Sequence, residues 1–231
     1  MINRKSVLAI TLARGGSKGI PKKNIADING KPLIQYTIDE VEKSKYIDHY
    51  IVSTDDDDIF DYCYKTAKVS TFERQEASDT QTSAEALWEV QRVMNMYDYV
   101  VEIMCTNPLK SVEDIDGVIE KLDETKADSV VSVVRIWDNH PSRVKYIEGD
   151  KLIDFYPEIP ESRRQDLTPP AYVRNGSIYA MTFEQLKIKQ QRLGEDTRPY
   201  IMPEERTINI DEPKDLELAK LMILKQGDNN E

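Results

Sequence analysis

Short apolar runs alternate with segments of helical periodicity over the first 136 residues of the chain. Residues 6–13 form an apolar run that ends at paired glycines, which is typical of a buried strand. Residues 31–45 instead carry apolar side chains at helical spacing, with acids and lysines between them, and this pattern predicts an amphipathic helix. The same two patterns predict further strands at 49–54, 68–72, 99–104 and 129–136, and further helices at 55–67, 84–97 and 111–122.

This alternation of elements predicts the fold class. Strands separated by helices of about 10–15 residues favour right-handed βαβ units, in which successive strands run parallel. We therefore expect an α/β protein with a mostly parallel central sheet and helices on both of its faces.

The alternation stops near Arg135, and the segment after residue 136 has a different character. Residues 137–172 hold five of the eleven prolines and only short mixed patterns, so we expect an extension that projects from the sheet. Regular patterns then predict a strand at 173–181, a helix at 183–191, a strand at 207–210 and a helix at 215–225. We predict one domain formed by residues 1–136 and 173–226, an extension at 137–172, and a frayed tail at 227–231.

The composition narrows the class of protein. The chain has 231 residues, the size of one domain with an appendage, and a net charge of −11. It lacks an apolar run of the roughly 20 residues that cross a bilayer, and its start lacks the apolar core of a signal peptide. We therefore expect a cytoplasmic protein with no membrane partner. The acidic balance argues against a nucleic-acid partner, because it repels a phosphate backbone.

The N-terminal segment reverses this charge. Residues 1–31 carry seven Lys and Arg side chains against one acid, which predicts a local site for an anion. Within this segment, residues 13–24 (A-R-G-G-S-K-G-I-P-K-K-N) follow the first predicted strand directly. Ligands of α/β sheets bind beyond the carboxyl ends of the strands, so this loop lies where a ligand would.

The loop has the composition of a polyphosphate cradle. Paired glycines let backbone N–H groups approach an anion closely, while Arg14, Lys18 and Lys23 supply positive charge. Its spacing matches neither the P-loop nor the G-x-G-x-x-G pattern. The alternative interpretation is a flexible basic turn without a ligand.

Two other features have structural explanations beside functional ones. The run of four aspartates at 55–58 could ligate a metal, but acids in the first turn of a helix are favoured by its dipole. Capping is the preferred interpretation of Asp56, Asp57 and Asp58. Cys105 could act as a nucleophile, but a cysteine at the end of a strand is more often a small core residue.

Six segments of the chain, in order, resemble one known family. The loop at 13–24 is similar to the signature of the CMP-N-acylneuraminate cytidylyltransferases, also called CMP-sialic acid synthetases. The others are residues 51–56 (I-V-S-T-D-D), 77–80 (A-S-D-T), 106–109 (T-N-P-L), 175–179 (N-G-S-I-Y) and 208–211 (I-N-I-D). On these motifs, residues 8–219 are identified as a member of the family.

The resemblance implies a Rossmann-like nucleotidyltransferase fold and a reaction. The expected reaction transfers CMP from CTP to the anomeric hydroxyl of a nine-carbon 2-keto sugar acid and releases pyrophosphate. Such a transfer needs charge neutralisation and in-line positioning more than covalent help, and the predicted catalytic residues are Arg14, Lys18, Lys23 and Asp211. The implied nucleotide-binding residues are Leu12, Ala13, Arg14, Gly15, Gly16, Lys18, Lys23, Asn24, Arg74 and Ser83. For Ser83, the alternative is the N-cap of the helix that follows it.

The resemblance also implies a divalent metal, Mg²⁺ or another cation, near residues 208–211. If this segment is a strand, Asn209 and Asp211 share its ligand-facing side. The family usually carries Asp at both positions, and Asn209 keeps only a neutral carbonyl. Mg²⁺ accepts one or two carboxylates together with phosphate oxygens, so Asp211 with Asn209 is the predicted metal site. The alternative for Asp211 is a cap of the last helix.

Sugar recognition departs most from the family pattern. The family glutamine expected to touch the sugar is replaced by Met104, and the family arginine two positions before the N-G pair is replaced by Val173, with Arg174 beside it. A related nonulosonic acid, such as legionaminic or pseudaminic acid, is therefore expected in place of N-acetylneuraminate. The predicted sugar-binding residues are Met104, Thr106, Arg143, Arg164, Arg174, Asn175 and Gly176.

The extension at 137–172 is expected to form a homodimer, with Arg143 reaching the partner's active site, and two-fold dimers are the commonest oligomers. Two other functions stay open from the sequence. One is a nucleotidyltransferase that acts on a sugar 1-phosphate, and the other is a nucleotide-binding homologue that has lost catalysis.

Overall fold

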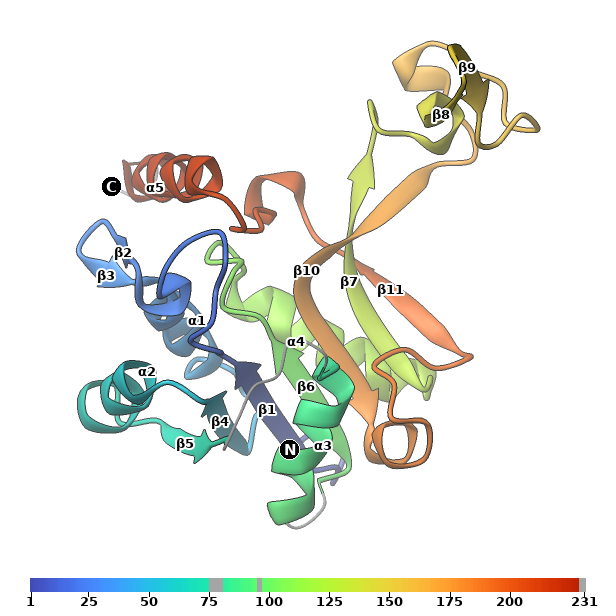
Figure 1. Cartoon of the computed structure of the whole chain (residues 1–231). Coiled ribbons are helices and arrows are strands. Elements are labelled where there is room, and N and C mark those ends of the chain that lie inside the picture. The colour runs from blue at the N-terminus through green and yellow to red at the C-terminus, as the bar shows by residue number, and fades with distance from the viewer. Residues whose placement is uncertain (75–80, 95–96, 229–231) are drawn as a thin grey trace.

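A seven-stranded sheet forms the centre of the protein (Figure 1). The computed structural model describes residues 1–74, 81–94 and 97–228. The strands lie in the order β11-β7-β10-β6-β1-β4-β5. Their bounds are β1 Val7–Leu12, β4 His49–Thr54, β5 Ser70–Glu73, β6 Tyr99–Ile103, β7 Ser129–Ile136, β10 Ala171–Thr182 and β11 Thr197–Ile201. Only β10 runs antiparallel to its neighbours among these strands, so the predicted mostly parallel sheet is confirmed.

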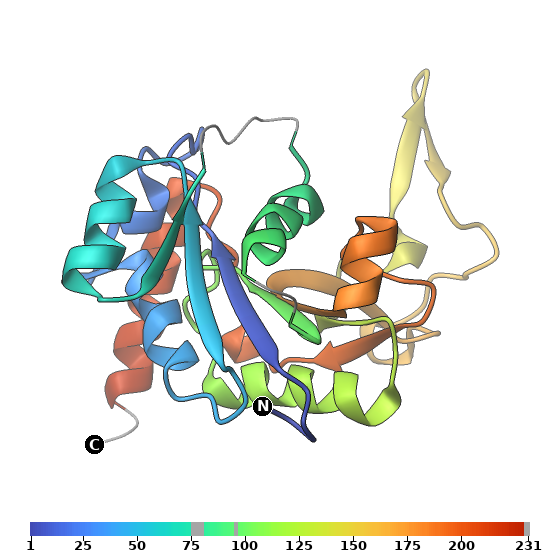
Figure 2. The same cartoon turned by 90° about the horizontal axis from the view of Figure 1, so that it is seen from below.

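Helices cover both faces of the sheet, as Figure 2 shows from below. The apolar run of β1 explains why, because alternate residues of a strand point to opposite faces. Val7 and Ala9 pack in one core cluster with α4, whereas Leu8 and Ile10 pack in another with α3. The helices are α1 Leu33–Val41, α2 Asp57–Asp61, α3 Ser83–Val93, α4 Val112–Thr125 and α5 Pro213–Asp228.

Short elements fill the connections between these helices and strands. Two of these elements in the described part of the chain are π-helices. The π-helix η2 Tyr62–Thr66 continues α2, and the π-helix η5 Gln185–Lys189 replaces the regular helix predicted at 183–191. The others are η1 Lys23–Ile25, η3 Pro141–Arg143, η4 Arg164–Asp166, η6 Glu204–Arg206, and the strand pairs β2 Asp27–Ile28 with β3 Lys31–Pro32 and β8 Lys145–Glu148 with β9 Lys151–Asp154.

The strand predicted at 207–210 is wrong. The strand in this part of the chain is β11, which lies along β7 and includes Pro199. A proline is tolerated there because β11 is at the edge of the sheet. Residues 207–210 have no strand partner, although Ile208 and Ile210 are buried against α5 and Asn209 is exposed. The alternation of buried and exposed side chains inferred from the sequence is therefore present, but without hydrogen-bonded pairing to a neighbouring strand.

The segment between β7 and β10 projects from the sheet (Figure 1). Its β8–β9 hairpin pairs within itself and is not part of the central sheet. At the other end of the chain, α5 continues to Asp228, into the segment predicted to be frayed, and residues 229–231 lie outside the described residues. Across the described ranges, none of the helices is long and apolar enough to cross a membrane.

Candidate active site

A cavity of about 630 Å³ lies at the carboxyl ends of β1 and β6. Leu12 ends β1 and Met104 follows β6, so the cavity occupies the position expected for a ligand of an α/β sheet. Most of the predicted nucleotide and metal residues line it, namely Leu12, Arg14, Lys18, Lys23, Asn24, Arg74, Ser83, Asn209 and Asp211. Two of the predicted sugar residues, Met104 and Thr106, line it as well.

Three predicted loop residues do not line this cavity. Ala13 is fully buried in the core beside α1. The N–H of Gly15 donates to Asp55 Oδ1 over 3.0 Å, and a side chain at Gly15 would collide with Asp56. A side chain at Gly16 would meet open space. The glycine pair thus shapes the loop, while Arg14 and Lys18 extend from it as exposed side chains that line the cavity.

Gly19 sets how closely the loop approaches the C-terminal part of the chain. A Cβ atom at Gly19 would lie 2.4 Å from the backbone carbonyl oxygen of Asp211, so only glycine fits this approach. The contact brings the loop cations and residues 209–211 to the same side of the cavity. Sequence reasoning did not single out Gly19, because its need is created by a segment almost 200 residues later.

Lys23 completes the connection between the two segments. Its Nζ donates to the carbonyl oxygen of Ile210 over 2.8 Å and to Asp211 Oδ1 over 2.9 Å. The Nδ2 of Asn209 donates to the other carboxylate oxygen of Asp211. The alternative role of Asp211 as a helix cap is not observed, since Asp215 accepts the N–H groups of residues 211 and 212.

Asn24 has a structural position behind the loop. Its Nδ2 donates to the carbonyl oxygen of Arg14 over 2.9 Å, and its Oδ1 accepts from Cys105 Sγ over 3.1 Å. Burial raises the pKa of the Cys105 thiol to about 11. A thiol with a raised pKa is a poor nucleophile, which agrees with the packing role preferred for Cys105 on sequence grounds.

Arg74 and Ser83 lie on the α3 side of the cavity. Arg74 is only 7% exposed, its Nη2 donates to the carbonyl oxygen of Ser53 over 3.4 Å, and its Nε has no hydrogen-bond partner within the described part of the chain. Burial lowers the pKa of its guanidinium, against the opposing effect of Asp55. The N-cap interpretation of Ser83 is wrong, because Thr82 caps α3 in a reciprocal box with Glu85.

The aspartate run has the predicted capping role. Asp56 Oδ1 accepts the backbone N–H groups of Asp58 and Ile59, so Asp56 is the N-cap of α2. Asp57 and Asp58 fall in the first turn, where the helix dipole favours acids. The motif at 77–80 lies outside the described residues.

A second cavity of about 320 Å³ adjoins the first, and Asn209 lines both. It contains three of the predicted sugar residues: Arg174, Asn175 and Gly176. Gly176 has a φ of +63° at a bulge in β10, which favours glycine. The Asn175 side chain is held by β7, since its Oδ1 accepts a hydrogen bond from Ser132 Oγ over 2.7 Å.

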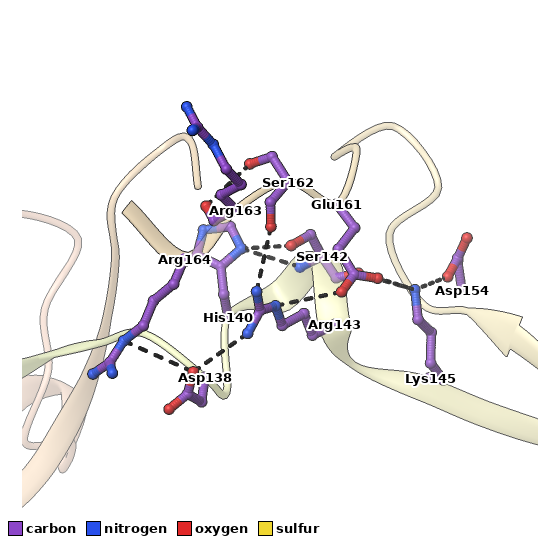
Figure 3. A network of polar contacts seen from close by, with 10 residues as sticks. All are labelled: Asp138, His140, Ser142, Arg143, Lys145, Asp154, Glu161, Ser162, Arg163 and Arg164. Atoms are coloured by element: carbon purple, nitrogen blue, oxygen red, sulfur yellow. Dashed lines mark hydrogen bonds and ion pairs between the residues drawn. The ribbon is translucent and has the colours of Figure 1, made fainter. Parts of the chain in front are cut away.

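Arg143 and Arg164 lie in the extension, in the network of polar contacts drawn in Figure 3. Neither lines either of the two cavities. The Arg143 guanidinium contacts Asp138 at 3.3 Å and Glu161 at 3.5 Å, and it donates to the carbonyl oxygen of Ser162. Arg164 shares Asp138 at 3.8 Å. In this chain they join the two sides of the extension, and their role in sugar binding stays a prediction.

Sequence reasoning missed Glu102 and Arg192, which form an ion pair of 2.9 Å between the two cavities. Glu102 is 1% exposed, and burial raises its pKa against the effects of Arg192 and Ser83. A signal was present, because Glu102 is a single charged residue within an otherwise apolar strand. Arg192 had no such signal, since it lies in a polar connection.

Comparison with known proteins decides the family. The sequence model described as cytidylyltransferase matches residues 8–227. This chain belongs to the cytidylyltransferase family. The predicted family and the predicted enzyme class are therefore confirmed, and the cytidylyltransferase has relatives that match along nearly its whole length.

Two relatives and one solved structure illustrate the similarity of this cytidylyltransferase. It is 30% identical to a pseudaminic acid cytidylyltransferase of Campylobacter jejuni, over 93% of this chain and 95% of that one. It is 32% identical to a CMP-N,N'-diacetyllegionaminic acid synthase of Legionella pneumophila, over 95% and 97%. A CMP:2-keto-3-deoxy-manno-octonic acid synthetase solved with CTP shares the fold, with a TM-score of 0.75, 19% identity and coverage of 96% and 99%.

Proposed function

We propose that this cytidylyltransferase transfers CMP from CTP to the anomeric hydroxyl of a nine-carbon 2-keto sugar acid of the legionaminic or pseudaminic type. The observation that carries the proposal is the convergence of Arg14, Lys18 and Lys23 on one cavity in a chain of net charge −11. The relatives named above supply the acceptor class, because their names specify pseudaminic and diacetyllegionaminic acid.

The residues divide the reaction between the two cavities. Arg74 and Ser83 lie where the nucleoside would bind, and the loop cations lie where they neutralise the triphosphate and the departing pyrophosphate. The acceptor occupies the side of Asn209, next to Arg174. The hydroxyl oxygen then attacks the α-phosphorus from the side opposite the leaving pyrophosphate, which requires positioning more than covalent help.

We propose Mg²⁺ as the cofactor, held by the Asp211 carboxylate and the Asn209 amide oxygen together with phosphate oxygens of CTP. Asp211 and Asn209 lie next to each other beside Lys23, and one carboxylate with phosphate oxygens suits Mg²⁺. The Asn209 amide, whose Nδ2 donates to Asp211, would turn to present its oxygen to the ion. The described ranges contain no cluster of three His, Cys, Asp or Glu residues that could hold an ion alone. When bound, the ion would neutralise phosphate charge.

A homodimer built through the extension is also proposed. The hairpin and the segment after it expose apolar side chains, among them Ile147 at 75% and Leu152 at 71%. Exposed apolar surface of this kind favours a protein interface. Light scattering on the purified protein should give twice the chain mass, and Ile147→Asp with Leu152→Asp should give a monomer. A monomeric parent protein would contradict the dimer.

The reaction is tested with purified protein, CTP, Mg²⁺ and a panel of nonulosonic acids, with the CMP-sugar detected by mass and pyrophosphate by a coupled assay. The expected result is a CMP-sugar from at least one diacetylated acid, and its absence from Asp211→Ala. Pyrophosphate release with sugar 1-phosphates alone would favour the other acceptor class. No turnover with any acceptor, despite CTP binding, would indicate a homologue that has lost catalysis.

A further inference from the structure

The cavity next to the nucleotide cavity contains two arginines in different surroundings. Arg174 comes from β10 and is exposed, whereas Arg192 comes from the segment after η5 and is half-buried. Within the described part of the chain, no carboxylate lies within ion-pair distance of Arg174, while Arg192 is paired with Glu102. The two side chains therefore offer different chemistry to an acceptor sugar, and this inference rests on the proposed function.

The Arg192 guanidinium is fixed from two directions. Its Nη1 donates to Glu102 Oε2 over 2.9 Å, and its Cζ lies 4.2 Å from the centre of the Tyr179 ring. Tyr179 and Glu102 are paired neighbours on β10 and β6, so both contacts come from rigid strands of the sheet. Stacking and a charge-assisted hydrogen bond together orient a planar guanidinium strongly.

The Glu102 carboxylate balances the positive charge of Arg192 but engages only one of its N–H groups. The described residues provide Arg192 with no hydrogen-bond acceptor other than Glu102. A guanidinium whose charge is already balanced by a carboxylate, and which is held in one orientation, suits a neutral oxygen better than a second anion. The carboxylate of the acceptor would instead prefer Arg174, whose charge is not balanced by a neighbouring acid.

The rest of the lining indicates which neutral oxygen this is. Val134, Val173 and the Tyr179 ring supply apolar surface around Arg192. An N-acyl group presents both a carbonyl acceptor and a methyl group, and therefore matches a cavity with N–H donors and apolar walls. A lone hydroxyl would leave the apolar walls without a partner.

We propose that Arg192 is a specificity-determining residue that donates a hydrogen bond to the carbonyl oxygen of an N-acyl group on the acceptor sugar. Glu102 is the positioning residue that orients it. Through its ion pair with Arg192, the buried carboxylate in β6 thus serves acceptor selection.

The test measures acceptor selectivity. The acceptors are the diacetylated nonulosonic acid that the wild type converts best and two analogues, each with one acetamido group replaced by a hydroxyl. For Arg192→Met, kcat/KM for the diacetylated acid should fall about tenfold to a hundredfold. It should reach the value that the wild type shows for the analogue lacking the acetamido group that Arg192 contacts. For that analogue kcat/KM should stay unchanged, as should the KM for CTP.

Two controls protect this test against a folding defect. Arg192→Met leaves the buried Glu102 carboxylate without a partner, which is destabilising, so the double variant Glu102→Leu with Arg192→Met replaces the whole pair by apolar groups. It should show the same loss of selectivity with a normal unfolding transition. Arg198→Met, an exposed arginine paired with Asp196, should keep the wild-type selectivity.

Each result decides between the hypotheses. An equal loss for the diacetylated acid and both analogues would overturn the N-acyl assignment and indicate a general contact, such as one to the carboxylate. Unchanged selectivity in both Arg192 variants would overturn any specificity role. A wild type that converts none of the acids would instead overturn the proposed function, and with it this inference, before any variant is compared.

Discussion

Lys23 and Asp211, which are 188 positions apart in the sequence, form an ion pair of 2.9 Å at the edge of the cavity proposed to bind CTP. Lys23 is the better buried of the two, with 13% of its side chain exposed against 64% for Asp211. The pair therefore connects the N-terminal loop predicted to bind phosphate to the predicted metal site. Several outcomes for variants depend on this connection.

Replacing Lys23 should impair the use of CTP far more than replacing its neighbour Lys22. Lys23→Ala removes a cation from the cavity, and we expect a loss of roughly 10²-fold in kcat/KM for CTP. Lys22 pairs with Asp58 outside the cavity, so Lys22→Ala should leave this constant nearly unchanged. Steady-state kinetics with varied CTP concentration measure both variants. Equal losses would contradict the role of Lys23 as a cation of the CTP site.

Asn209→Asp should make the enzyme bind Mg²⁺ more tightly. The added carboxylate next to Asp211 supplies a second charged oxygen ligand. We expect the concentration of Mg²⁺ that gives half-maximal rate to fall severalfold, and to rise in Asp211→Asn. The measurement is a Mg²⁺ titration at saturating CTP. If both variants titrate like the wild type, the metal does not bind at these residues.

Gly19→Ala and Gly16→Ala should differ sharply although both add one methyl group to the same loop. At Gly19 the new Cβ would meet the Asp211 carbonyl oxygen at 2.4 Å, whereas at Gly16 it meets open space. We expect Gly19→Ala to weaken CTP binding about tenfold by displacing the loop cations. Equilibrium titration with CTP would detect this. Similar affinities in the two variants would contradict the close approach.

Replacing Thr82 should affect the stability of the protein, whereas replacing Ser83 should affect nucleotide binding. Thr82 caps α3, and Thr82→Ala should lower the free energy of unfolding by about 1 kcal/mol. Ser83→Ala should have little effect on unfolding but raise the KM for CTP, because Ser83 lines the cavity without capping the helix. Urea unfolding combined with kinetics checks the pair, and the reverse assignment of effects would restore Ser83 as the cap.

Lys110 should make the stability of the protein depend on pH. It is fully buried, and its Nζ donates to Thr37 Oγ1 over 2.7 Å and to the carbonyl oxygen of Asn107. Burial lowers the pKa of Lys110 from 10.5 to about 7. Between these two values the unfolded chain binds more protons than the folded chain, so the free energy of unfolding rises with pH.

The replacement Lys110→Met should remove this rise, because no lysine then needs to lose its proton on folding. Urea unfolding at pH 7 and pH 9 measures the difference for each protein. Lys189→Met, which changes an exposed lysine, should retain the wild-type increase. An unchanged increase in Lys110→Met would assign the pH dependence to another group.

Local patterns predicted most of the sheet and its helices well. The apolar run of β1, the periodic faces of α1, α3 and α4 and the glycine-rich loop are all encoded by neighbouring residues. The strand predicted at 207–210 failed because alternating burial can arise from packing against α5 without any strand partner. The edge strand β11 was missed because Pro199 is unfavourable in a strand unless one side of it lacks a partner.

The sequence by itself determined the α/β class, the family and the gathering of cations in the loop at 13–24, since these depend on periodicity and on motifs of contiguous residues. Only the tertiary structure decided that Gly19 must be small, that Lys23 meets Asp211 and that Glu102 orients Arg192 between two cavities. These contacts join residues 90 to 192 positions apart, and such pairs are set by how distant segments of the chain pack at the ends of the strands and not by any local pattern.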